Sequence, residues 1–430
     1  MSMTQPQVVN DTDTGVPQMP PNLTAFSHIV EQYATDGAFL WLLRNNAIQS
    51  TLYTVEDIAE LDVRIHGHLQ GLRSAGELGW GVCRQQLEYE DSGEAFMAGV
   101  YAFQSADPAK IQYACEQALA NTEMRKGLVS AMGWIDTATA NYWIDRFLAV
   151  KDPGYRYLGL AACSVRRYDP RQRLNYLLAD EKLPEQSETY SRMLRLIGEV
   201  KRFDLMPALN QGMASEHATV KFWAYRSAVL LGNRACVANL KDYVIKDNPC
   251  KARALELVFN VLPVPEARQW IGEISSDLAQ NRSVIMATAI LGDPHAIGWL
   301  IQQMQKPVYA RLAGLAFTLI TGIDLEQSRL HKAIVAPVPD TEQEDYEDAA
   351  EDIDSDLAWP DHARVKAYWD QHGQSLQIGQ RYFLGQPVNT PHLKQVLETG
   401  NQLQRQFAAI KLALADPDEP LHNTAKANIN

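Results

Sequence analysis

The sequence predicts an all-α protein built from stacked helical repeats, and three observations support this fold class. From about residue 93 to residue 325, helical runs alternate with short breaks at Gly, Pro or Asp. These breaks recur at a regular interval along the chain. Strand signals, which are alternating apolar runs joined by Asn-Gly turns, are scarce.

The N-terminal region divides into two predicted parts. Residues 1–22 are rich in Pro, Thr, Asn and Gln, which predicts a disordered tail. They lack the basic start and apolar core of a secretory signal, so we expect a cytoplasmic protein. Residues 23–92 contain long amphipathic runs, which predict an N-terminal helical cap over the first repeat.

Residues 93–335 are predicted to form the repeats. The stops of the first helices fall roughly 29 to 34 residues apart, which is the length of a helix–turn–helix repeat. These anchor positions are Gly133, Arg167, Gly198, Gly232, Pro263, Gly292 and Gly322. The match is degenerate, as is usual for HEAT-like repeats. We therefore predict a HEAT-like helical-repeat solenoid with a short C-terminal helical extension.

Local chemistry agrees with this repeat. Gly just past a helix accepts the left-handed conformation that closes the last turn. Asp-Pro pairs open helices well, because Asp caps free N–H groups and Pro fits the first position. Such pairs begin at Asp107, Asp169 and Asp293. The second helices carry one-sided apolar stripes, such as Ile297, Leu300, Ile301 and Met304.

The composition changes abruptly after the repeats. Residues 336–357 are predicted to be an acidic linker, because carboxylates dominate residues 340–356. Residues 358–418 are predicted to form the C-terminal helical extension, whose middle run, IGQRYFLGQPV, suggests a turn or short hairpin. Residues 419–430 are predicted to be a disordered tail.

Overall charge and cysteine usage narrow the function classes. The net charge is −13 and the pI is near 5.3, which disfavours binding to nucleic acid or to anionic membranes. No run of eighteen apolar residues predicts a membrane span. The five cysteines are widely spaced without a CxxC pair, so we expect reduced, buried side chains.

No catalytic motif, cofactor fingerprint or metal-ligand pattern is present, so we predict a non-enzyme without cofactors. His66 and His68 are two residues apart, which on a helix directs them to different faces. Asp352, Asp354 and Asp356 resemble the start of a calcium loop, but Leu357 replaces its central Gly. We therefore expect solvated surface histidines and, for the aspartates, a disordered acidic segment.

A basic residue early in the first helix of several repeats is the most suggestive pattern. In a stacked array these residues would line up along one edge and could meet an acidic partner or the acidic linker. The alternative is that they cover apolar stems or pair with nearby carboxylates. Among the recurring tryptophans, most would serve the core and one or two could anchor an interface. The candidate partner-binding residues are Arg156, Lys221, Arg253, Arg282, Arg311, Trp223 and Trp299.

Several segments together resemble a known family. These are LDVRIHGHLQGLRSAG, repeats ending in LITGIDL, an acidic stretch leading into LAWPD, then GQRYFLGQPV and RQFAAIKLALA. The chain resembles, over residues 23–415, a family of HEAT-like accessory proteins of bacterial type VI secretion. This resemblance carries over no catalytic residues. It implies a role around a secreted toxin or a secretion-spike component.

Three functions remain open at this stage. The first is an adaptor or chaperone for a secretion cargo or toxin, and the second is an immunity protein that neutralises a sibling toxin. The third is a HEAT-like DNA glycosylase or DNA-binding protein, which the acidic composition disfavours. The expected partner is therefore another protein, with no nucleic acid and no membrane.

Overall fold

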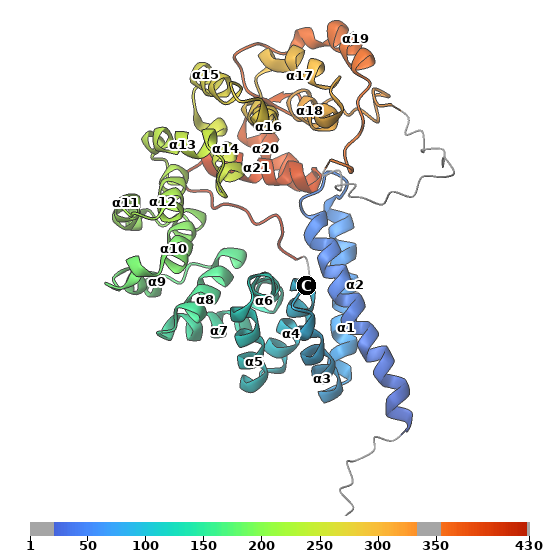
Figure 1. The fold of residues 1–430 in the computed structure, drawn as a ribbon, viewed down its shortest axis with the longest axis vertical. Coiled ribbons are helices and arrows are strands. Elements are labelled where there is room, and N and C mark those ends of the chain that lie inside the picture. The colour runs from blue at the N-terminus through green and yellow to red at the C-terminus, as the bar shows by residue number, and fades with distance from the viewer. Residues whose placement is uncertain (1–20, 333–353, 428–430) are drawn as a thin grey trace, which may run out of the picture.

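The computed structural model describes residues 21–332 and 354–427, and in this part of the chain it is all-α. The described residues form twenty-one α-helices and one β-hairpin, whose two strands are each two residues long. Figure 1 shows the helices following a curved arc, in two rows, with the long α1 (Pro21–Ala47) and α2 (Val55–Ser74) along one side. The prediction of an all-helical repeat solenoid is confirmed.

Helices with even numbers form the inner row of the arc, and each packs against its neighbours along most of the row. They are α4 (Ser92–Ser105), α6 (Thr122–Trp134), α8 (Pro153–Arg166), α10 (Ser187–Glu199), α12 (Ala218–Leu230), α14 (Lys251–Val261), α16 (Asn281–Leu291) and α18 (Pro307–Thr321).

The outer row consists of shorter helices that cover the inner row from outside (Figure 1). They are α5 (Pro108–Ala120), α7 (Thr137–Ala149), α9 (Gln172–Leu178), α11 (Met206–Met213), α13 (Lys241–Ile245), α15 (Val264–Ile274) and α17 (Ile297–Gln303). Short 3₁₀ turns connect several elements at Leu87–Tyr89, Leu183–Glu185, Phe203–Leu205, Arg234–Leu240, Leu278–Gln280, Pro294–Ala296 and Gly373–Ser375.

The first three helices pack on the start of the inner row. Both α1 and α3 (Glu77–Gln86) contact α4. Trp41 of α1 stacks on Phe96 of α4 with ring centroids 5.2 Å apart. A buried ion pair between Arg44 and Asp62 joins α1 to α2. Because both charges are buried together, neither is left unpaired inside the packed helices.

Most of the Asp and Gly residues that were predicted to start or end helices do so in the structure. Asp107 caps α5, accepting a hydrogen bond from the Ala109 N–H at 2.9 Å, with Pro108 at the first helical position. Gly292 and Gly322 end α16 and α18 in the left-handed conformation, with φ of 72° and 71°. Arg167 takes the same conformation at the end of α8, with φ of 52°. The Asp-Pro pair at Asp169 is an exception.

The expectation that Asp169 opens a helix is wrong. Its side chain accepts from the Arg171 N–H at 2.8 Å, and α9 starts one residue later, at Gln172. The Asp169 carboxylate also pairs with Arg202 at 3.0 Å. The aspartate therefore shapes a turn and joins two repeats, because a short side chain can cap a turn as readily as a helix.

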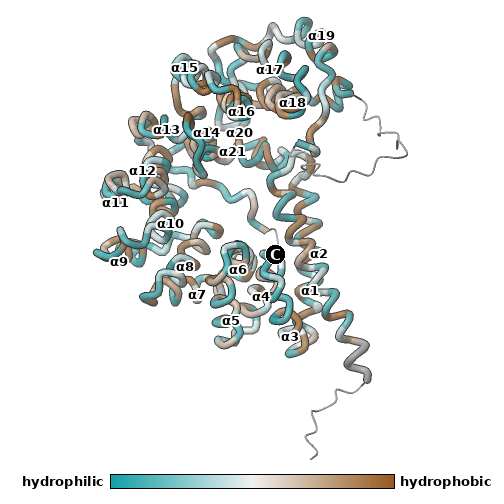
Figure 2. Tube along the Cα trace, viewed as in Figure 1, coloured by the Kyte–Doolittle hydropathy of each residue, from teal (hydrophilic) through white to brown (hydrophobic). Residues whose placement is uncertain are grey.

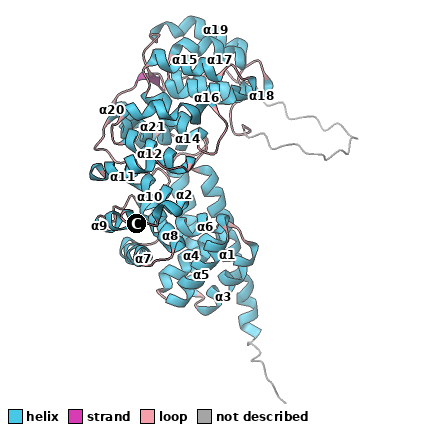
Figure 3. Ribbon diagram, turned by 60° about the vertical axis from the view of Figure 1, so that its left-hand side comes forward, coloured by secondary structure: helices cyan, strands magenta, loops and turns pink. Residues whose placement is uncertain are grey.

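The C-terminal region contains α19 (His362–His372), a hairpin, α20 (Thr390–Thr399) and α21 (Gln402–Ala415). The hairpin pairs β1 (Tyr382–Phe383) with β2 (Gln386–Pro387), and Figure 3 shows no other strand in the described residues. Its turn residues Leu384 and Gly385 both have positive φ, at 50° and 78°. Positive φ at both positions matches the twist of a two-residue hairpin. The IGQRYFLGQPV run is thus the short hairpin that we considered.

After the hairpin, the chain turns back along the inside of the arc (Figure 1). We call residues 379–427 the C-terminal strap. At one point the strap closes the arc, because α21 meets the loop between α1 and α2. The Gln402 N–H donates to the Tyr53 carbonyl at 2.9 Å, and the Gln406 side chain donates to the Ile48 carbonyl at 2.5 Å.

The last described residues correct the prediction of a disordered tail from residue 419. Residues 419–427 lie against the inner row, where the Leu421 N–H donates to the Glu199 carbonyl at 3.3 Å. The Asn423 side chain donates to the Val165 carbonyl at 2.6 Å. A polar sequence can be ordered in this way when its partners are helix-end carbonyls, which composition does not reveal.

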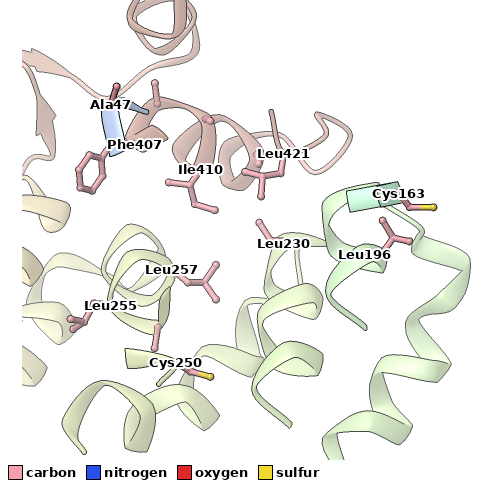
Figure 4. Packing of buried hydrophobic residues seen from close by; sticks show 14 of the residues in the cluster. Ala47, Cys163, Leu196, Leu230, Cys250, Leu255, Leu257, Phe407, Ile410 and Leu421 are labelled. Carbon is pink, nitrogen blue, oxygen red and sulfur yellow. The ribbon is translucent and has the colours of Figure 1, made fainter. Parts of the chain in front are cut away.

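Buried apolar residues join the strap to the inner row in one core. Figure 4 shows Ile410 and Leu421 of the strap facing Leu230 and Leu257 of α12 and α14. In Figure 2, hydrophobic and hydrophilic residues alternate along the helices, as expected for helices with one buried face.

Two further expectations concern the core and the membrane. All five cysteines are buried, and burial raises the pKa of the Cys83 and Cys115 thiols to about 12. Buried thiols with a raised pKa behave as small apolar side chains, as the sequence suggested. Among the described residues, no helix combines the length and apolar character needed to span a membrane.

Candidate protein-binding surface

The inner helices present the same face to the interior of the arc in successive repeats. On α10 this face carries Arg192, Arg195 and Glu199, at positions i, i+3 and i+7, which lie on one side of a helix. On α12 the corresponding residues are Trp223, Arg226 and Leu230. On α14 they are Arg253, Glu256 and Asn260. We call this side of the inner row the inner face.

The strap covers the part of the inner face that is formed by the C-terminal halves of the inner helices. It contacts Glu199 through Leu421, and Asn260 through Lys411, whose ammonium donates to the Asn260 side chain at 2.6 Å. The part of the inner face formed by the N-terminal halves of α10, α12 and α14, one to two helical turns away, makes no such hydrogen bond to the strap among the described residues, and we call it the uncovered half. Most of its inner-face residues are arginines or aromatic residues.

Trp223 is the centre of the uncovered half. The guanidinium groups of Arg195, Arg226 and Arg253 lie 4.9, 5.5 and 5.7 Å from its ring centroid. These arginines come from α10, α12 and α14, so the indole joins three repeats. Each contact is within the range in which a ring face attracts a cation.

Two further aromatic rings extend this arrangement along the inner face. Arg125 and Arg192 lie 5.2 and 5.9 Å from the Tyr157 ring of α8. At the other end of the row, Arg311 lies 5.0 Å from the Trp359 ring, just before α19. We call the whole set the arginine–aromatic row: Tyr157, Trp223 and Trp359 with Arg125, Arg192, Arg195, Arg226, Arg253, Arg282 and Arg311.

One carboxylate of the acidic segment is bound by this row. Asp354 is 6% exposed, and Arg282 donates to both of its oxygens, at 2.8 and 2.7 Å. Arg311 donates to the Asp354 backbone carbonyl at 3.1 Å. A bidentate guanidinium–carboxylate pair is among the strongest polar contacts in proteins. The rest of the predicted linker up to residue 353 lies outside the described residues.

Arginines on the inner face are only partly neutralised by glutamates. Arg195 pairs with Glu199 at 2.7 Å, and Arg125 pairs with Glu188 at 2.7 Å. Burial raises the pKa of Glu199, but Arg195 and Arg167 outweigh it and hold the pKa below its ordinary value. Glu199 therefore stays ionised.

Arg226 differs from these paired arginines. It is 3% exposed, and desolvation lowers its pKa to about 10. Its Nε and Nη1 have no hydrogen-bond partner among the described residues. A buried cation with unpaired donors destabilises the fold. It is therefore a candidate for a role in binding.

Four of the predicted partner-binding residues come together on this surface: Arg253, Arg282, Arg311 and Trp223. Arg156 does not, because it is buried and pairs with Asp180 of its own repeat at 2.9 Å. Lys221 lies half-buried in the first turn of α12, on a different side of the helix from Trp223. Trp299 lies on outer helix α17 and packs against the core.

Sequence reasoning missed Arg125, Arg192, Arg195, Arg226, Tyr157 and Trp359. A signal for two of them existed, because Arg192 and Arg226 both lie six residues before their anchors, Gly198 and Gly232. Both arginines lie beyond the first helical turn, whereas the predicted arginines and lysine lie near the starts of their helices. Trp359 carried no such signal, since it comes from outside the repeats.

No group of three or more His, Cys, Asp or Glu side chains in residues 21–332 and 354–427 is arranged to hold a metal ion. The chemistry that the surface offers is recognition of anions by arginine and aromatic groups.

No protein-family model, no curated protein and no solved structure matches this chain.

Proposed function

We propose that the protein is a non-catalytic scaffold that binds an acidic segment of another protein along the arginine–aromatic row. The observation that carries this proposal is the seating of Asp354 on Arg282 and Arg311. A carboxylate on a polypeptide is thus already a ligand of the row.

Two physical arguments support a protein partner. Arg and aromatic residues are enriched among the residues that contribute most to protein interfaces. The guanidinium groups are also held over rings before any partner binds, so fewer rotamers are lost on binding.

The finer proposal is an adaptor or chaperone for a type VI secretion cargo or toxin. It is supported only by the resemblance of the sequence segments. In this role the row would hold an acidic segment of the cargo or of a spike component until delivery.

The test is co-purification from the native host followed by mass spectrometry, with the wild-type protein and with Arg192→Glu and Arg146→Glu variants. The proposal predicts that one acidic partner is lost from Arg192→Glu and kept by Arg146→Glu, which makes the same change at an exposed position of outer helix α7. Equal recovery with both variants would contradict a role for the row.

An immunity protein is the alternative within the same binding class. Deleting the gene distinguishes the two roles. Loss of an adaptor abolishes toxin delivery to neighbouring cells, whereas loss of an immunity protein makes the cell sensitive to its siblings.

DNA binding is the second candidate class, because seven arginines along a concave face could contact phosphates. The glutamates within the row and the net charge of −13 disfavour it. A labelled duplex should therefore show no binding at physiological salt. Binding that weakens steeply with salt would favour the DNA reading.

A further inference from the structure

A cavity of about 340 Å³ opens on the inner face between α8, α10 and α12. Its walls include the Tyr157 and Trp223 rings, with Arg192 and Arg195 between them. Ser191 and Glu188 also line it. Two of the three rings of the arginine–aromatic row therefore flank the cavity, and two arginines of the row line it.

Several polar atoms at this cavity have no protein partner. Ser191 is 6% exposed, and neither its Oγ nor the Arg192 Nε has a hydrogen-bond partner in the described part of the chain. Arg226 lies beside Trp223 with two unpaired donor atoms of its own. Buried donors in native proteins are nearly always paired, so this set points to an acceptor from outside.

The charge around the cavity also favours an anion. Five arginines, from Arg125 to Arg253 along the row, lie around it, whereas the nearby acids are Glu188, Glu199 and Glu256. Glu199 is shared with a further cation, Arg167. The surplus is therefore positive despite the acidic chain.

The other end of the row shows which anion such a group accepts. There, Arg282 holds the Asp354 carboxylate, and Arg311, which lies over the Trp359 ring, donates to the Asp354 backbone carbonyl. The cavity repeats these parts with Arg192, Arg195 and Trp223. The arrangement at Asp354 is thus a template, within the same molecule, for the cavity.

We propose that the cavity is a carboxylate pocket, which takes a Glu or Asp side chain of the acidic partner. This inference depends on the function proposed above and names the chemical group that the row recognises. In the pocket, Arg192 and Ser191 donate hydrogen bonds to the carboxylate. Arg226 does not line the pocket but lies 5.5 Å from the Trp223 ring centroid, from where it adds positive charge.

A polypeptide fits this pocket better than a polyphosphate. Glu188 lines the cavity and would repel the dense charge of a phosphate chain, whereas acidic side chains spaced along a peptide can avoid it. Low dielectric around the buried arginines strengthens their attraction for a single carboxylate.

The experiment measures fluorescence anisotropy of a labelled peptide of alternating Glu and Ser, with the full-length protein. Its Gln-for-Glu counterpart and an oligodeoxynucleotide are the comparison ligands. The variants are Arg192→Gln and Arg226→Met. The matched control is Arg146→Gln, because Arg146 lies 5.4 Å from each of two aromatic rings on outer helix α7.

We expect Arg192→Gln and Arg226→Met each to weaken binding of the Glu peptide by at least about tenfold. Arg146→Gln should stay within about twofold of wild type. Arg226→Met also removes the arginine that most strongly offsets the desolvation of Glu256, so its thermal melting is measured alongside binding. Arg192→Gln leaves this pair intact, so a loss of binding by Arg192→Gln at an unchanged melting temperature does not reflect unfolding.

The outcomes separate the two proposals. A further variant, Arg282→Gln, changes the other end of the row. If the Glu peptide binds the wild-type protein and only Arg282→Gln weakens that binding, the carboxylate pocket is refuted, whereas the proposal that the arginine–aromatic row binds an acidic segment is not. If the Glu peptide does not bind the wild-type protein, or binds no better than the Gln peptide, both are refuted. If the oligonucleotide binds more tightly than the peptide, the ligand is nucleic acid and the pocket assignment fails.

Discussion

The two halves of the inner face each adjoin a desolvated arginine, but the two arginines differ in how fully they are hydrogen-bonded. Where the strap covers the inner face, Arg381 of the strap donates to the carbonyls of Phe259 and Leu262 at the end of α14. In the uncovered half, Arg226 is more deeply buried, at 3% exposed, yet two of its donor atoms have no partner among the described residues. Desolvation lowers the pKa of both to about 10.

The difference lies in what each arginine does for the fold. The last carbonyls of a helix have no partner inside the helix, and a cation there also offsets the negative end of the helix dipole. Arg381 therefore stabilises the repeat array directly. Arg226 has the contact with Trp223 and the attraction of Glu256, but its Nε and Nη1 are unpaired among the described residues, which fits the proposed role in binding better than a role in the fold.

Other cations of the strapped half also donate hydrogen bonds to backbone carbonyls. Lys411 donates to the Ile290 carbonyl at 3.1 Å, and Lys201 donates to the carbonyls of Leu230 and Ala413 at 2.5 and 2.8 Å. Arg167 donates to the Leu421 carbonyl. We call the strapped half the structural seam, because its cations join helix ends to the strap, whereas the uncovered half is the proposed binding surface.

The largest expected effect on stability comes from the contact between the strap and a helix end. Gly292→Ala should destabilise the protein by roughly 2–4 kcal/mol, because its φ is 72° and a Cβ would lie 2.1 Å from the Tyr382 carbonyl oxygen. Gly298→Ala in α17 has no atom within 4 Å of the new Cβ and should stabilise by about 0.5–1 kcal/mol. Urea denaturation measures the free energy of unfolding of both variants. Equal effects would contradict a structural role for the contact between the strap and the end of α16.

The next effect concerns the cation that satisfies three carbonyls. Arg381→Met should cost about 2 kcal/mol, because the carbonyls of Phe259, Leu262 and Leu291 lose their donor inside the protein. The comparison variant is Arg253→Met in the uncovered half, expected within about 0.5 kcal/mol of wild type. Thermal melting of the two variants tests the contrast.

A pH effect should follow from Lys411. Desolvation, together with Arg381, lowers its folded-state pKa to about 7, whereas the unfolded pKa is the ordinary 10.5. Between these values the unfolded chain binds more protons, so stability rises with pH, by up to about 1.4 kcal/mol per pH unit. Lys411→Met removes this contribution.

We therefore expect the stability of wild type relative to Lys411→Met to increase from pH 7 to pH 9. Taking the difference cancels the thiols and other groups that titrate in both proteins. A difference that is constant with pH would show that Lys411 stays protonated in the folded state.

The smallest effect on stability should come from the filled end of the row. Asp354→Asn removes the ion pair with Arg282, whose side chain is 35% exposed and can be solvated. We expect a loss of about 1 kcal/mol or less in urea denaturation. A loss as large as that of Gly292→Ala would mean that this end is also a structural seam.

The sequence predicted the fold well because repeats are encoded locally. Helix stops such as Gly292 and stripes such as Ile297, Leu300 and Ile301 follow from backbone preference and burial of one face. The strap was not foreseen, because its contacts join residues far apart, such as Arg44 and the Ala425 carbonyl. No local pattern encodes such a pairing.

The binding surface was predicted only in part for the same reason. Arg282 and Arg311 were found because they recur at one position of the repeat. Whether a recurring cation pairs within its repeat, as Arg156 does with Asp180, or lies over a ring from another repeat, as Arg253 does, depends on packing between helices.

Hydrogen–deuterium exchange with and without the Glu–Ser peptide tests the contrast between the two halves most directly. The account predicts added protection in residues 187–195 and 218–226, at the starts of α10 and α12, and no change in residues 402–427. Protection confined to the strap, or protection on the outer row alone, would contradict it.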